Sequence, residues 1–193
     1  MAGGSADAEG GPGNGSALCL RCGLCCDGTL FGETVVRIPE RGYVEFLGLE
    51  VRDGAGHGLV APQPCSAFVD GCCALYEVGR PANCDEYRCA VLTGYTDGRA
   101  GLDDSLAVIR RVRSLAREIE FEMGLPVGEY SMTALTGYLA EHEPWSEPER
   151  HRRFLVAFHR FHELGRAHFG CDAKPMEEKA AAAGERLAAA ADS

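Results

Sequence analysis

The sequence predicts a mostly helical protein, in which a loop-rich, cysteine-rich module with a few short strands packs on a small helical bundle. Two observations predict this class. Nine of the ten cysteines lie between Cys19 and Cys89, among many turn-forming residues. After about residue 96, apolar residues recur at helical spacing instead. At 193 residues the chain has the length of one domain, or of one domain with an appendage.

Composition divides the chain into four parts. Residues 1–17 are mostly Gly, Ala, Ser, Asp and Asn, so we expect a disordered arm. Residues 18–95 form the cysteine module, and residues 96–170 form a helical region packed on it. Residues 171–193 form an Ala-rich tail that can be helical. Because the tail lacks large apolar residues, we expect this helix to fray.

Short strands are expected within the cysteine module. Residues 35–38 (Val-Val-Arg-Ile) form one candidate strand, which Pro39 ends. Residues 43–49 form a short apolar element that is either helix or strand. The turn-rich residues 54–58 then lead to a second short strand at residues 59–60.

The first long helix is expected to begin at Asp103 or Asp104 and to run to about Met123. Gly124 and Pro126 end it. Its apolar residues recur at intervals of three and four and define one face: Leu102, Leu106, Ile109, Val112, Ala116, Ile119 and Met123.

Two further helices are expected after this one. Residues 131–141 form the shorter helix. Ser146 and Glu149 form a capping-box pair ahead of a third helix that runs to about Phe169. The apolar face of this third helix holds Phe154, Ala157, Phe158 and Phe161.

The cysteine spacing is typical of metal ligands. Cys19, Cys22 and Cys25 recur every third residue and Cys26 follows at once, which places soft sulfur donors on one tight turn. The other cysteines of the module are Cys65, Cys72, Cys73, Cys84 and Cys89. Tetrahedral zinc takes four thiolates, and a [4Fe–4S] cluster also takes four, often three of them from such a turn. Eight ligands would fill two such sites.

Charge and the N-terminal residues narrow the function classes. Residues 1–17 have neither a basic start nor an apolar run, and no stretch is apolar enough to span a membrane. We therefore expect a cytoplasmic protein, in a reducing compartment where clustered thiols bind metal rather than form disulfides. The net charge of −10 disfavours nucleic acid as a partner.

Several spaced motifs carry a resemblance to a known family. They are Cys19-Leu-Arg-Cys22-Gly23-Leu-Cys25-Cys26, then Cys65, Cys73-Ala-Leu-Tyr76, Arg80-Pro81-Ala-Asn-Cys84 and Tyr87-Arg88-Cys89. In this order they resemble the bacterial CxxCxxCC family, YkgJ-like cysteine-cluster proteins described as zinc- or iron-chelating domains. The resemblance covers about residues 18–90. It implies eight metal ligands: Cys19, Cys22, Cys25, Cys26, Cys65, Cys73, Cys84 and Cys89.

The chain departs from the family pattern at two positions. Ser66 stands where the family often has proline, and Asp85 stands where it often has a basic residue. Neither change removes a ligand, but both alter the surroundings of the site.

Residues near the cysteines can compensate the charge of a metal–thiolate centre. Zinc with four thiolates carries a formal charge of about −2. Arg21, Arg80 and Arg88 can donate to the sulfurs, although Arg80 can equally form an ordinary surface ion pair. Gly23 permits a left-handed turn between ligands, which points backbone N–H groups at sulfur.

Other candidate ligands have simpler explanations. His159 and His162 lie one turn apart on the third helix and can face a metal together, but a helix rich in Arg and Glu also carries histidine on its solvated face. His57 can replace a cysteine ligand. Cys72 is expected to be spare, and Cys171 to belong to the core or the surface.

The residues predict a metal-binding protein that holds zinc or an iron–sulfur cluster, with an undefined biological role. Two alternatives stay open: a metal- or cluster-dependent enzyme, acting in electron transfer or in modification of another protein, and a metal store or carrier. The sequence names no substrate and has no phosphate-binding loop, nucleophile elbow or HExxH motif, so an enzyme is not the first prediction. The expected partner is the metal ion or cluster, and another protein is a further candidate.

Overall fold

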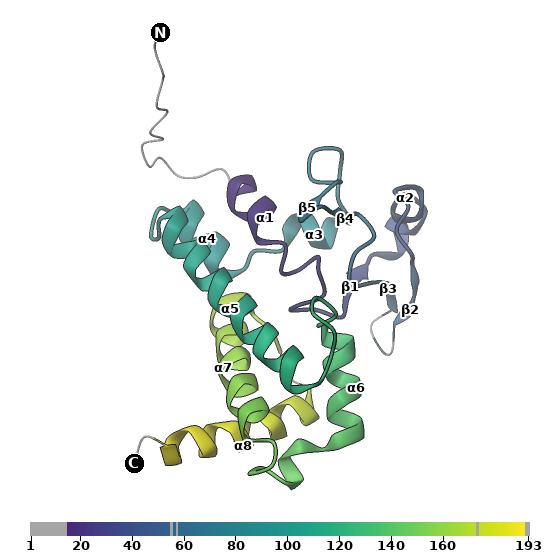
Figure 1. Ribbon diagram of the computed structural model, residues 1–193. Coiled ribbons are helices and arrows are strands. Elements are labelled where there is room, and N and C mark those ends of the chain that lie inside the picture. Colours follow the sequence, from purple (N-terminus) through teal and green to yellow (C-terminus); the bar gives the residue numbers. More distant parts are fainter. Residues whose placement is uncertain (1–14, 55, 57, 173, 192–193) are drawn as a thin grey trace.

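The computed structural model describes residues 15–191 except 55, 57 and 173 (Figure 1). This part of the chain is mostly helical, with eight α-helices and a few short strands, as the predicted fold class states. None of the helices described is long and apolar enough to cross a membrane. The expectations for residues 1–14 and for position 57 lie outside the described residues. Helix α1 (Ser16–Cys22) begins inside the predicted arm.

Five helices form the C-terminal half of the protein (Figure 1). They are α4 (Ala90–Thr96), α5 (Leu102–Glu122), α6 (Met132–His142), α7 (Arg152–Phe169) and α8 (Pro175–Ala191). Helix α7 packs against α5 and α8, and α8 also contacts α6. The three helices expected from apolar spacing are therefore present, with ends that differ by one or two residues for the first two and by several at the start of the third.

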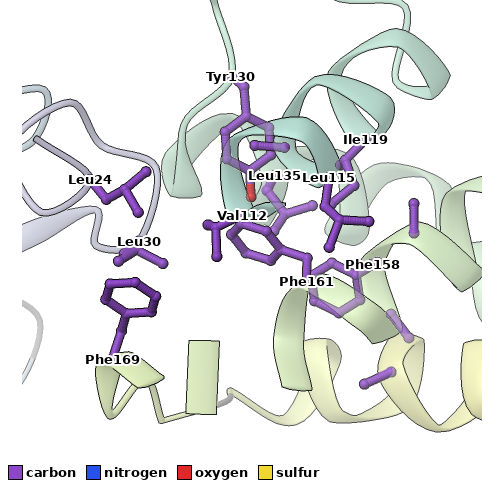
Figure 2. Packing of buried hydrophobic residues seen from close by; sticks show 14 of the residues in the cluster. Leu24, Leu30, Val112, Leu115, Ile119, Tyr130, Leu135, Phe158, Phe161 and Phe169 are labelled. Atoms are coloured by element: carbon purple, nitrogen blue, oxygen red, sulfur yellow. The ribbon is translucent and has the colours of Figure 1, made fainter. Parts of the chain in front are cut away.

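The main hydrophobic core lies between these helices and extends into the cysteine module. Val112 and Ile119 of α5 pack with phenylalanines of α7, and all are almost fully buried. Figure 2 shows Leu24 and Leu30, from the loop that follows α1, reaching this core beside Phe169. The predicted boundary at residue 95 separates two kinds of sequence, but the core runs across it.

A small antiparallel sheet forms the far side of the cysteine module. Its strands β1 (Glu33–Val36), β2 (Arg52–Gly54) and β3 (Gly58–Pro62) are arranged in the order β1-β3-β2, with Val35 opposite Val60. Helix α2 (Arg41–Phe46) covers it, so the ambiguous element at residues 43–49 begins as a helix. A second cluster of four buried residues holds this part together: Val36, Val44, Leu49 and Ala61.

The remaining elements of the module are very short. Strands β4 (Phe68–Val69) and β5 (Cys72–Cys73) pair with each other, and α3 (Ala82–Glu86) follows. Strands β2, β4 and β5 were not expected from the sequence, because segments of two or three residues show no periodicity. The strand expected at residues 35–38 ends at Val36, and a 3₁₀ turn (Ile38–Glu40) follows it.

The predicted capping box ahead of α7 is wrong. Helix α7 begins at Arg152, and Ser146 closes a 3₁₀ turn in which its hydroxyl donates to the carbonyl of Glu143. Glu149 pairs with Arg152. Pro148 explains why α7 begins later than predicted, because a residue that precedes proline avoids the helical conformation. Glu147, which precedes it, has φ −125° and ψ 64°.

The tail forms helix α8, and small residues bring it close to α7. Ala180, Ala183 and Gly184 are buried in this contact. A Cβ atom added to Gly184 would lie 2.0 Å from the carbonyl oxygen of Leu155 in α7. Small residues therefore let α8 approach α7 closely, and Leu187 of α8 is also buried in the main core. The expectation of fraying considered side-chain size and left out this close approach of two backbones.

Candidate metal centre

A cavity of about 720 Å³ lies between the cysteine module and the helices. Ile109 of α5 and Phe169 at the end of α7 line its helical side. Eight cysteines also line it: Cys19, Cys22, Cys25, Cys26, Cys65, Cys73, Cys84 and Cys89. These are the eight predicted ligands, whereas Cys72 and Cys171 are not among the lining residues. The chain thus brings into one cavity the cysteines that the motifs single out.

The first four cysteines are placed by the end of α1 and the turn after it. Gly23 ends the helix with φ +65°, the left-handed conformation that was expected there. Its carbonyl accepts from the N–H of Cys26 (2.8 Å) and of Asp27 (2.9 Å), which closes the turn. A Cβ at position 23 would also lie 2.4 Å from the ring of Phe68. Both the backbone and the packing therefore require glycine here.

Later segments of the module supply the next two cysteines of the cavity, Cys65 and Cys73. The N–H of Cys65 donates to the carbonyl of Cys26 (2.8 Å), which fixes the two loops against each other. Cys73 lies in β5 opposite Phe68, half-buried. Its neighbour Cys72 is exposed and donates to the carbonyl of Leu20. The strand thus directs one member of the vicinal pair toward the cavity and the other away from it.

Helices α3 and α4 supply the last two cysteines. The sulfur of Cys84 in α3 lies 4.0 Å from the hydroxyl oxygen of Thr34 in β1. Cys89 precedes α4 as its N-cap, and its sulfur accepts from the N–H of Leu92 at 3.3 Å. Burial raises the pKa of Cys89 above its usual value, and hydrogen bonds from the backbone N–H groups of Leu92 and Val91 act against this rise.

Four of the thiols are close neighbours on the helical side; we call Cys19, Cys22, Cys25 and Cys89 the inner set. Burial, together with a smaller effect of the nearby Cys89 and Cys19, raises the pKa of Cys22 to about 12. Burial also raises the pKa of Cys25 well above its usual value, with contributions from the other three and from Cys171. All four pack against the main core.

The other four thiols are neighbours on the side of the sheet; we call Cys26, Cys65, Cys73 and Cys84 the outer set. The hydrogen bond between Cys26 and Cys73 raises the pKa of Cys26 and lowers that of Cys73. Burial raises the pKa of Cys65 and of Cys84, and the nearby Cys73 raises both further. Of this set, Cys65 packs against the second, smaller cluster.

Arg80 lies beside both sets. Its guanidinium stacks on the ring of Tyr76, 4.1 Å from the centroid, and donates to Asp85. Its positive charge lowers the pKa of thiols from each set, against the effect of burial: Cys19, Cys73 and Cys84. Arg80 thus forms the surface ion pair considered for it, with Asp85, and its charge also acts on thiols of both sets.

Arg113 of α5 is a site residue that the sequence did not reveal. It donates to the carbonyl of Cys22 and pairs with Asp27 at 2.9 Å, so it fastens the cysteine turn to the helical bundle. One signal was available: Arg113 follows Ile109 by four residues, on the apolar face of its helix. Of the arginines predicted near the site, Arg88 lines the cavity and Arg21 does not.

The histidines of α7 lie outside the cavity. His159 approaches Glu163 at 3.6 Å. The Nε2 atom of His162 is buried and has no hydrogen-bond partner among the described residues. Neither histidine is a lining residue of the cavity that holds the eight cysteines.

The thiols line one cavity, but their sulfur atoms are not gathered around one position. Within residues 15–191, apart from the three undescribed positions, no three or more Cys, His, Asp or Glu side chains are gathered tightly enough to hold a metal ion. Comparison with known proteins adds no relative: no family model, curated protein or solved structure matches the chain significantly. The resemblance to the CxxCxxCC family therefore rests on the spaced motifs.

Proposed function

We propose that this chain is a metal-binding protein that holds zinc or an iron–sulfur cluster through clustered cysteine thiolates. The observation that carries the proposal is the shared cavity: eight of the ten cysteines line it, from segments as distant as α1 and α4. A structural role for free cysteines would scatter them through the core as small apolar residues. Eight thiols that line one cavity instead support a role as metal ligands.

The chemistry of the cavity fits such a metal. Thiolates are soft ligands that both zinc and iron–sulfur clusters accept. The sulfurs are on side chains that line one cavity and can rotate about χ1. The negative charge that builds up on metal–thiolate centres faces Arg80 and Arg88 along the lining, and Arg113 behind Cys22.

Anaerobic purification with elemental analysis and a visible spectrum tests the proposal. We expect either a colourless protein with about two zinc ions per chain, or a brown protein with broad absorption near the violet. The colour decides between the two metals. A reduced, folded protein that contains neither zinc nor iron, and takes up neither on reconstitution, would contradict the proposal.

The ligand assignment predicts different results for two cysteine substitutions. Cys22→Ser should lower the metal content and destabilise the module, because metal binding is coupled to the order of the loops that supply the ligands. Cys171→Ser should change neither property, although Cys171 lies near Cys25 and Cys89. Metal content and thermal unfolding of the two variants measure this difference. Equal metal loss in both would mean that the site is misplaced.

Arg113→Gln should weaken metal binding about 10-fold, the lower end of the range for residues that orient a ligand from behind. The expected cause is loss of the bond to the Cys22 carbonyl and of the pair with Asp27. Arg111→Gln is the matched control, because Arg111 is exposed on the same helix. Competition with a chromophoric chelator measures both affinities, and equal effects of the two changes would refute this role.

A metal- or cluster-dependent enzyme is the second candidate, and the size of the cavity favours it. A volume of about 720 Å³ lies within the range of small-molecule sites. An enzyme of this kind needs an open coordination position, whereas a storage or structural site does not. Cobalt-substituted protein whose spectrum shifts when imidazole is added would support the enzyme, and an unchanged spectrum would count against it.

A further inference from the structure

We propose that the eight thiols form two unequal metal centres: an inner one that retains its metal, and an outer one that exchanges it. The inner centre uses the inner set (Cys19, Cys22, Cys25 and Cys89), and the outer centre uses the outer set (Cys26, Cys65, Cys73 and Cys84). This inference rests on the proposed function and assigns the ligands within it.

The boundary between the inner and the outer set falls between the adjacent residues Cys25 and Cys26. Cys25 packs against the main core together with Cys22 and Cys89. Cys26 instead hydrogen-bonds to Cys73, and its carbonyl holds the loop of Cys65 at 2.8 Å. Neighbouring side chains that diverge in this way cannot readily serve one metal, but each completes a set of four. Four thiolates are the complement of a zinc ion or of a [4Fe–4S] cluster.

The inner set is attached to the most strongly packed part of the molecule. Cys19 and Cys22 lie on α1, whose Leu18 is buried in the main core, and Leu24 follows in the turn (Figure 2). Cys89 begins α4, which contacts α5 and α7. Opening this centre requires α1 or α4 to leave the core. We therefore expect a metal held there to leave slowly.

Three of the four outer ligands, all except Cys26, are attached to short elements or loops with little core of their own. Cys73 lies in a two-residue strand and Cys84 in a five-residue helix. Cys65 packs against the second cluster, which in the described part has four buried residues. Segments with few buried contacts open at low free energy, so their ligands separate often. A metal held there should exchange with solution while the inner centre stays filled.

Metal release from the zinc-loaded protein tests this difference. The full chain is reduced, loaded with zinc alone under argon, and mixed with excess chromophoric chelator. We expect two phases of about one zinc ion each, the slower at least 10-fold slower than the faster. Zinc is a suitable probe for either native metal, because thiolate centres accept both. A single phase that releases all the zinc would overturn the inference.

Vicinal cysteines provide matched variants. Cys73→Ser should remove the fast phase and keep the slow one, whereas Cys72→Ser should keep both, since Cys72 is exposed and donates to Leu20. Cys25→Ser should remove the slow phase, and circular dichroism should show that its helices persist. If Cys73→Ser and Cys25→Ser remove the same phase, the two sets are one centre and the inference is wrong.

The outcomes separate this inference from the proposed function. A protein that binds no zinc at all contradicts both. A protein that binds zinc, but loses it in one phase or in the same phase in every variant, contradicts only the division into two centres. Loss of the slow phase in Cys171→Ser would place Cys171 in the inner centre and overturn the assignment of its ligands.

Discussion

Removal of metal by a strong chelator is expected to disorder residues 33–84 and to leave α5, α6 and α7 folded. The second cluster buries four residues, which contribute on the order of 10 kcal/mol at most. This is a small core for a segment of this length, so bonds between its thiolates and metal are expected to fix its shape.

Hydrogen exchange measured by mass spectrometry, with and without the chelator, checks this expectation. Peptides from residues 33–84 should lose protection by at least 100-fold, and peptides from α5 and α7 should change little. Peptides that contain Leu18 and Leu24 should lose an intermediate degree of protection, because both side chains are buried in the main core. Complete loss of helical circular dichroism on chelation would show instead one cooperative unit built around the metal.

Only part of the group of eight cavity cysteines could be predicted from local spacing. Cys19, Cys22 and Cys25 recur every third residue, which places them on one turn, whereas the distant cysteines were named from the resemblance to spaced motifs. Gly23 could be predicted for the same reason, since the turn needs a left-handed residue between donors. Helix α5 likewise shows its apolar face as a local period.

The division of the thiols could not be predicted, because it depends on contacts between distant segments. Cys26 meets Cys73 across many intervening residues, and Cys89 reaches the inner set only when α4 packs on α5. Arg113 could not be predicted for the same reason: its partner Cys22 ends α1, and its partner Asp27 lies in the loop that follows. The spacing of residues along the chain predicts which of them share a turn, but it does not predict which turns contact one another in the fold.

One local prediction was wrong and another left out a contact, and each has a physical cause. The capping box at Ser146 matched a sequence pattern, but Pro148 prevents the helix from starting there. The tail was judged by side-chain size alone. Close helix packing can also come from small residues, since the distance between two backbones decreases when no Cβ lies between them. The distance between the backbones of α7 and α8 at Gly184 cannot be predicted from amino-acid composition.

Gly184→Ala is expected to lower the free energy of unfolding by about 2 kcal/mol or more. In most helix interiors this change stabilises by about 0.5–1 kcal/mol, because glycine has the higher backbone entropy. Here the new Cβ would lie 2.0 Å from the carbonyl oxygen of Leu155 and 2.7 Å from the Cβ of His159. These are a backbone atom and the root of a side chain, so α7 and α8 must separate, and such overpacking costs about 1–3 kcal/mol.

Gly137→Ala is the matched control, because Gly137 lies within α6 and has no atom within 4 Å of its added Cβ. It should stabilise the protein by about 0.5–1 kcal/mol, so the two substitutions have opposite signs. Urea denaturation followed by circular dichroism measures both. If Gly184→Ala is as stabilising as Gly137→Ala, then α8 does not rest against Leu155 in solution. The frayed tail that its composition suggested would then be the correct description of residues 175–191.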